Sequence, residues 1–137
     1  MARVLAIDYG TKRVGLAVTD PLQIIASPLE TVHSKDIINY LKDYFLKEPV
    51  NTIVVGLPKS LNNTQTNATP HVKAFVKHLS KVFEEKEIVL HDERFTSKMA
   101  LDAMIQSGSK KKDRRQKGNI DKISAAIILQ SYLASKS

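Results

Sequence analysis

The sequence predicts an α/β fold, in which helices pack on a sheet that contains parallel strands. Short apolar runs typical of strands alternate with longer segments whose apolar residues recur at helical spacing. One run, residues 52–57 (TIVVGL), is apolar on both faces, which is typical of a central parallel strand. The chain has 137 residues, the size of one domain, and we therefore expect a single domain over residues 1–137.

Residues 3–20 predict a β-hairpin, because two runs of alternating apolar residues surround a turn bracketed by Gly10 and Gly15. The first strand delivers a carboxylate, Asp8, at its end. A carboxylate that ends a buried strand requires a cation, hydrogen-bond donors or a function. The hairpin alone leaves open whether turn amides hold Asp8 or whether it serves chemistry. The turn itself carries two basic residues, Lys12 and Arg13.

The segment after the hairpin predicts a third strand and a first helix. Residues 24–25 and 29–32 indicate one strand interrupted by Pro28, and a proline favours an edge position. Ser34 is the expected N-cap of a helix whose apolar residues recur at helical spacing over residues 37–46. The central parallel strand follows this helix and opens into a polar loop.

The next helix is expected to start at Thr69, with Pro70 at its first helical position. Its apolar residues form a continuous stripe over residues 72–83, which indicates a face packed on the sheet. The two histidines of this helix, His71 and His78, fall away from the stripe and are expected at the surface.

The last third of the chain predicts a strand at residues 87–90 and two helices. Thr96 or Ser97 caps the first helix and Gly108 ends it. Asn119 is the expected N-cap of the second. Asp121 lies on one stripe with apolar residues four, seven and eleven positions on, which turns it towards the sheet. The alternative is an acid that only complements the helix dipole.

Three acids that are distant in the sequence stand at the ends of predicted elements: Asp8, Glu93 and Asp121. Divalent cations such as Mg²⁺ prefer oxygen ligands and usually take only a few protein carboxylates, so that water and substrate phosphate complete the coordination. Two such ions can activate a water molecule and stabilise the leaving oxygen of a phosphodiester. The three acids therefore favour phosphodiester hydrolysis, although acids this far apart occur in many unrelated proteins.

The net charge of +7 is concentrated in residues 110–117 (KKKDRRQK), which carry six basic side chains and one acid. Such a cluster indicates a polyphosphate partner, usually nucleic acid. The alternative is a solvated loop without a ligand. With 6% aromatic residues and no tryptophan, we expect contacts to phosphates rather than base stacking.

Composition also bears on the compartment. The absence of cysteine excludes disulfides and thiolate metal sites and fits a reducing environment. No apolar run approaches the roughly 20 residues of a membrane span, and the N-terminus lacks the pattern of a signal peptide. We therefore expect a cytoplasmic protein without a membrane partner.

Four motifs together resemble the YqgF/RuvX family, whose members are described as Holliday junction resolvases or pre-16S ribosomal RNA nucleases. They are Asp8-x-Gly10-Thr11-x-x-x-Gly15-x-Ala17, Gly56-Leu57-Pro58, Asp92-Glu93-Arg94-x-Thr96 and Lys117-x-x-x-Asp121-x-x-x-Ala125-Ala126-x-x-Leu129-x-x-Tyr132. The resemblance covers essentially the whole chain. It departs at Asn63, where the family commonly has glycine, and asparagine tolerates left-handed backbone better than most residues.

The resemblance implies an RNase H-like fold: a central mixed five-stranded sheet with three leading antiparallel strands and helices on both faces. It implies a hydrolase, a nuclease that depends on Mg²⁺ or Mn²⁺ held by Asp8, Glu93 and Asp121. It also implies 5′-end processing of pre-16S ribosomal RNA in ribosome biogenesis, with the small-subunit precursor as a partner. The basic residues that we expect to contact substrate phosphates are Lys12, Arg13, Arg94, Lys110, Lys111, Lys112, Arg114, Arg115 and Lys117.

Alternatives stay open at this point. A Holliday junction resolvase would act as a dimer on four-way DNA, whereas RNA trimming needs no dimer, and the sequence is compatible with a monomer or a weak homodimer. A non-catalytic RNA-binding ribosome assembly factor would keep the fold without turnover. Asp-x-Gly-Thr after a strand also resembles the phosphate loop of sugar kinases, actin and Hsp70-type ATPases, which need two such domains to enclose a nucleotide.

Overall fold

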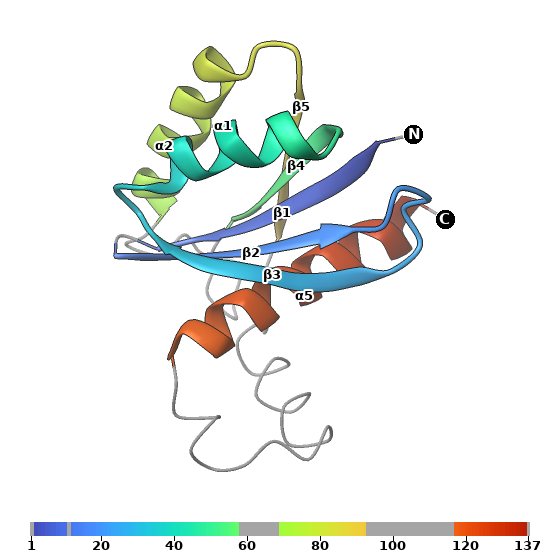
Figure 1. Cartoon of the computed structure of the whole chain (residues 1–137). Coiled ribbons are helices and arrows are strands. Elements are labelled where there is room, and N and C mark those ends of the chain that lie inside the picture. The colour runs from blue at the N-terminus through green and yellow to red at the C-terminus, as the bar shows by residue number, and fades with distance from the viewer. Residues whose placement is uncertain (1, 11, 58–68, 93–116, 137) are drawn as a thin grey trace.

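A computed structural model describes residues 2–10, 12–57, 69–92 and 117–136. It contains β1 (Arg3–Tyr9), β2 (Arg13–Thr19), β3 (Ala26–His33), α1 (Ile37–Lys47), β4 (Val50–Leu57), α2 (Thr69–Val82), β5 (Glu87–Asp92) and α5 (Lys117–Lys136). The five strands form one sheet in the order β3-β2-β1-β4-β5. Helices α1 and α2 cover one face of this sheet and α5 covers the other (Figure 1). The expected mixed five-stranded sheet with helices on both faces is confirmed.

The first three strands form an antiparallel meander, and the last two join it in parallel. β1 pairs antiparallel with β2, and β2 pairs antiparallel with β3. On its other side β1 pairs parallel with β4, which in turn pairs parallel with β5. The hairpin predicted at residues 3–20 and the central parallel strand predicted at residues 52–57 are both confirmed.

β3 is an edge strand, as Pro28 predicted, but the inclusion of residues 24–25 in it was wrong. Ile24 and Ile25 precede the strand and are exposed. The cause is the Asp20 carboxylate, which accepts hydrogen bonds from the N–H groups of Leu22, Ile24 and Ile25 at 2.8–3.1 Å and so holds a turn. These bonds, that of Ile25 above all, lower the pKa of Asp20.

Two of the predicted helix caps were wrong. The residue that caps α1 is Asp36 rather than Ser34, and its side chain makes no capping hydrogen bond. Ser34 lies in the turn between β3 and α1, in which the Asp36 N–H donates to the His33 carbonyl at 2.9 Å, and its own N–H donates to the Lys12 carbonyl at 3.0 Å. Asn119 lies inside α5, because the backbone is already helical at Lys117. As a result Asp121 belongs to the second turn of α5 rather than the first.

The sheet separates two apolar cores. On one face, Leu5 and Ile7 of β1 pack with the apolar stripe predicted from the sequence, which consists of buried Val72, Phe75 and Leu79 of α2 and buried Phe83 directly after it. On the other face, Val4 and Ala6 of β1 pack with α5 through its buried residues Ala125, Ala126, Ile128, Leu129 and Tyr132. His71 and His78 are exposed, as predicted. No helix among the described residues is long and apolar enough to cross a membrane.

The two cores predict a sharp contrast between leucines on the α1–α2 face. Leu79→Ala removes a fully buried side chain from α2 and should lower the free energy of unfolding by about 2–5 kcal/mol. Leu46→Ala is the matched control, because the Leu46 side chain on α1 is 86% exposed and its loss should change stability little. Urea denaturation followed by circular dichroism measures both, and equal effects would contradict this packing.

Candidate active site

The carboxyl ends of β1, β4 and β5 meet at one edge of the sheet, because these strands run parallel. Asp8 lies at this edge, opposite Gly15 of β2 and one residue beyond the pair that Ile7 forms with Val55 of β4. β4 and β5 end beside it at Leu57 and Asp92. Ligand sites of α/β sheets commonly lie at the carboxyl ends of strands. A site that contains the predicted acids is therefore expected at this edge.

The alternation of β1 places Asp8 on the face that α5 covers. Val4 and Ala6 are buried in the core that includes α5, whereas Leu5 and Ile7 belong to the opposite core. Side chains two residues apart share a face of a strand, so Asp8 continues the row of Val4 and Ala6. Its side chain is half-buried. The acid thus stands at the sheet edge, where the apolar row ends.

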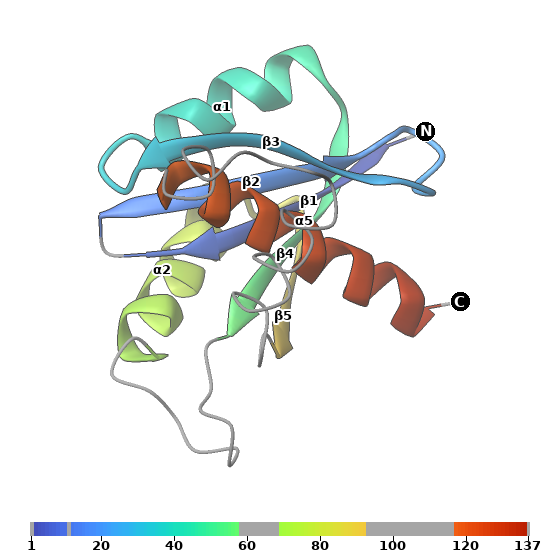
Figure 2. The same cartoon turned by 90° about the horizontal axis from the view of Figure 1, so that it is seen from below.

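Helix α5 brings the backbone of Asp121 to the same face and the same end of the sheet. Asp121 lies one turn before Ala125, which is fully buried against the strands. The N-terminal end of α5 lies at the end of the sheet where β1 passes into β2, and its C-terminal end lies near the start of β1 (Figures 1 and 2). Asp8 and Asp121, 113 positions apart in the sequence, are therefore gathered at one end of one face.

The third acid, Glu93, lies outside the described residues, but the strand before it is informative. Val89 packs with the core of α5, and His91 reaches the same helix, with Nε2 at 2.9 Å from Ser131 Oγ and its ring beside Tyr132. Val89 and His91, two residues apart, therefore share the face of the sheet that α5 covers.

The hairpin turn places basic side chains at the same edge. Lys12 and Arg13 are exposed at the turn that follows β1. Gly10 shapes this turn, because a Cβ atom there would lie 2.6 Å from the Arg13 carbonyl oxygen. The Lys12 carbonyl also accepts the N–H of Ser34, which ties the turn to the segment before α1. Two exposed basic side chains thus follow Asp8 at this edge.

Several predicted residues cannot be placed. The helix predicted between Thr96 and Gly108 lies outside the described residues. The same holds for Asn63, Arg94, Lys110, Lys111, Lys112, Arg114 and Arg115. Lys117 is placed by its backbone as the first residue of α5. Among the described residues no group of three or more histidine, aspartate or glutamate side chains is arranged to hold a metal ion. The predicted triad includes Glu93, which lies outside the described residues.

One polar residue near the site escaped the sequence analysis. Ser124 lies three residues after Asp121 on α5 and is 1% exposed, and its Oγ has no hydrogen-bond partner in the part of the chain that the structure describes. Buried hydroxyls are normally paired. A serine directly before Ala125 and Ala126 looks in the sequence like one more small packing residue. Only its burial identifies it as unusual.

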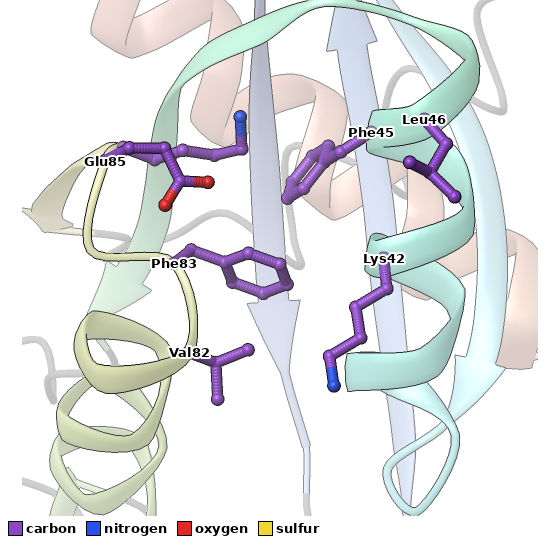
Figure 3. A pocket seen from close by; sticks show the side chains of 7 residues that line it. Lys42, Phe45, Leu46, Val82, Phe83 and Glu85 are labelled. Carbon is purple, nitrogen blue, oxygen red and sulfur yellow. The ribbon is translucent and has the colours of Figure 1, made fainter.

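A pocket of about 380 Å³ lies away from this edge. It is lined by side chains of α1 and of the α2–β5 connection, including Phe45, Phe83, Lys42 and Glu85 (Figure 3). Lys86 beside it donates to the carbonyl of Val50, the first residue of β4, so the pocket lies at the opposite end of the strands from Asp8. It is not part of the candidate active site.

The relationship to known proteins is clear at the level of sequence. Residues 2–135 match the model of a family described as "RuvX: Holliday junction resolvase". The chain belongs to the RuvX family. A relative from Flavobacterium johnsoniae is 50% identical over 136 residues, which cover 99% of both chains. One from Amoebophilus asiaticus is 51% identical over 135 residues, which cover 98% of this chain and 96% of the relative. Both are named "Putative pre-16S rRNA nuclease".

One solved structure agrees with this chain in fold. RuvC of T. thermophilus, solved in complex with a Holliday junction substrate, superposes with a TM-score of 0.60 and 18% identity, over 99% of this chain and 96% of that one. At this identity the likeness concerns the fold, which is RNase H-like. The predicted family and fold are confirmed, and this RuvX protein is a nuclease and hence a hydrolase. Family membership decides against the ATPase alternative.

The turn of this RuvX protein provides a stability test. Gly10→Ala should lower the free energy of unfolding by about 1–3 kcal/mol, because the new methyl group and the Arg13 carbonyl cannot share the present space. Since the same turn joins Asp8 to Lys12, nuclease activity should fall under conditions where the variant is fully folded. Urea denaturation and a cleavage assay measure the two effects, and a variant with unchanged stability would contradict the close contact.

Proposed function

We propose that the protein is a divalent-metal-dependent nuclease that processes the 5′ end of pre-16S ribosomal RNA. The observation that carries the proposal is the half-buried carboxylate of Asp8 at the carboxyl edge of the sheet, on the face to which α5 contributes Asp121. The relatives named for this RNA are about half identical to the chain over almost its whole length, which supports the substrate. A small-subunit precursor would then be the partner.

The acids at this edge fit a hard divalent cation. Carboxylate oxygens are the ligands that Mg²⁺ and Mn²⁺ prefer, and Asp8, Asp121 and Glu93 supply three of them in this proposal. Bound there, the metal would supply Lewis-acid activation of water and charge stabilisation at the scissile phosphate.

In this proposal, the basic residues of the chain bind the phosphates of the substrate. Exposed Lys12 and Arg13, which follow Asp8 in the hairpin, would hold a phosphate beside it. In this proposal, flanking phosphates are held by the residues that the sequence analysis selected, namely Arg94, Lys110, Lys111, Lys112, Arg114, Arg115 and Lys117. Binding through phosphates carries no base sequence, so the cleavage position would depend on RNA shape.

Removing one acid tests the site. Asp8→Asn and Asp121→Asn should each lower the cleavage rate by at least about 100-fold, because each change removes a negatively charged oxygen ligand that would hold the metal, while folding and much of the RNA binding persist. Asp43→Asn is the matched control, since Asp43 is an exposed acid of α1, the helix on the opposite face of the sheet. Gel-based cleavage with Mg²⁺, Mn²⁺ or EDTA measures the rates. Undiminished cleavage by either acid variant would remove that residue from the site.

A second candidate, resolution of four-way DNA, is favoured by the family description and by the fold shared with RuvC. Symmetric resolution requires two paired active sites and hence a dimer. We expect the wild type to cut a short RNA that carries the 5′ extension of the precursor, and not to nick a synthetic four-way junction symmetrically. Symmetric nicking by a species that sediments as a dimer would instead favour the resolvase. Binding of both substrates without cleavage would favour the non-catalytic assembly factor.

The compartment and the oligomeric state follow from the substrate in this proposal. A nuclease that matures ribosomal RNA in a bacterium works in the cytoplasm, where that RNA is made. Cleavage of one strand needs one active site, so a monomer suffices, and a weak homodimer would not alter the chemistry.

A further inference from the structure

The exposed side of α2 carries a row of lysines that neither the motifs nor the candidate site include. Lys73, Lys77 and Lys81 are all exposed and lie four residues apart. At 1.5 Å rise per residue the row spans about 12 Å along the helix, with each lysine one turn from the next. We call these three residues the α2 lysine row.

The charge of this row is not compensated within its own helix. Thr69–Val82 contains no aspartate or glutamate, and none of the three lysines takes part in an ion pair with the described residues. Helix α1 differs, because Asp43 stands directly beside Lys42 and four residues before Lys47. Like charges four residues apart destabilise a helix. A solvated helix face gains nothing from such a repeat, whereas a polyanion-binding face does.

The row is physically connected to the candidate active site. Tyr9, the residue after Asp8, stacks its ring on Phe75 of α2, with centroids 4.2 Å apart and planes inclined by 16°. Phe75 lies two residues from Lys73 and two from Lys77. The first half of α2 is thereby fixed to the carboxyl end of β1. Figures 1 and 2 show the start of α2 at this end of the sheet and the rest of the helix running away from it.

We propose that the α2 lysine row binds the phosphate backbone of the RNA substrate beyond the cleavage position. The strand would pass the carboxyl edge at Asp8 and continue over the outer side of α2, where each lysine neutralises a phosphate. Lysine binds phosphate as a point charge. This contact therefore increases affinity and positions the RNA but does not recognise its base sequence. The proposal names a contact of the substrate and in that sense rests on the proposed function.

The test compares two triple variants that remove the same charge. Lys73→Gln/Lys77→Gln/Lys81→Gln removes the row, and Lys35→Gln/Lys42→Gln/Lys47→Gln removes three exposed lysines on and just before α1, on the same face of the sheet. Both variants lower the net charge equally. A difference between their RNA affinities therefore depends on where the lysines lie. Thermal unfolding verifies that both are folded.

Binding is measured by fluorescence anisotropy with a labelled precursor RNA in EDTA, over a range of KCl concentrations. Loss of three phosphate contacts should reduce the slope of log K against log salt by about 2 for the row variant. Its affinity at moderate salt should fall about tenfold, as expected for three exposed charge contacts. The control variant should stay within about twofold of the wild type. Equal losses in the two triple variants, or no loss in either, would overturn the proposal.

Because EDTA prevents metal-dependent cleavage, this experiment is independent of the nuclease assignment. A wild type that binds RNA through the row but cuts no substrate would contradict the proposed function and leave the row in place. RNAs of different lengths separate the lysine-row proposal from the proposed nuclease function further. The row variant should lose affinity for RNA that extends beyond the cleavage position and bind RNA truncated there like the wild type, and equal losses on both RNAs would place the contact elsewhere.

Discussion

The pairing of β1 with strands on both sides is the constraint on which the rest of the structure depends. Its parallel pairing with β4 fixes which edge of the sheet collects strand ends, and its antiparallel pairing with β2 places a turn at that same edge. Because β1 is buried on both faces, its register cannot slip by one residue without moving Ile7 and Ala6 into the wrong cores. The orientation of Asp8 is thereby a consequence of core packing.

The strands and the packed faces of the helices could be predicted from the sequence, because they follow from the periodicity of apolar residues. The stripe of α2 and the close approach of Ala125 and Ala126 are examples. The turn before β3 and the start of α1 could not, because they depend on particular hydrogen bonds. Asp20 holds Ile24 and Ile25 out of β3, and a turn closed by the bond from the Asp36 N–H to the His33 carbonyl precedes α1.

For the candidate site, chemistry and resemblance selected Asp8, Glu93 and Asp121, and the fold places Asp8 and the backbone of Asp121 on the same face of the sheet. No pattern in the sequence states which face of the sheet the last helix covers, so the shared face of Asp8 and α5 appears only in three dimensions. The burial of Ser124 and the uncompensated lysines of α2 were likewise missed. Serine is a common small residue, and a charged helix face is usually only a solvent-exposed surface, so neither feature is distinctive in the sequence.

The two alanines of α5, Ala125 and Ala126, let this helix approach the sheet closely. Ala125 and Ala126 contribute only methyl groups between the helix and the small residues of the sheet, Ala6 and Ala17. Helix–sheet separation grows with side-chain volume at the contact. The separation between Asp8 and the backbone of Asp121 is therefore set by Ala125 and Ala126, and a larger side chain at either position would widen it. In the proposed mechanism, the two acids would then be too far apart to serve one phosphate.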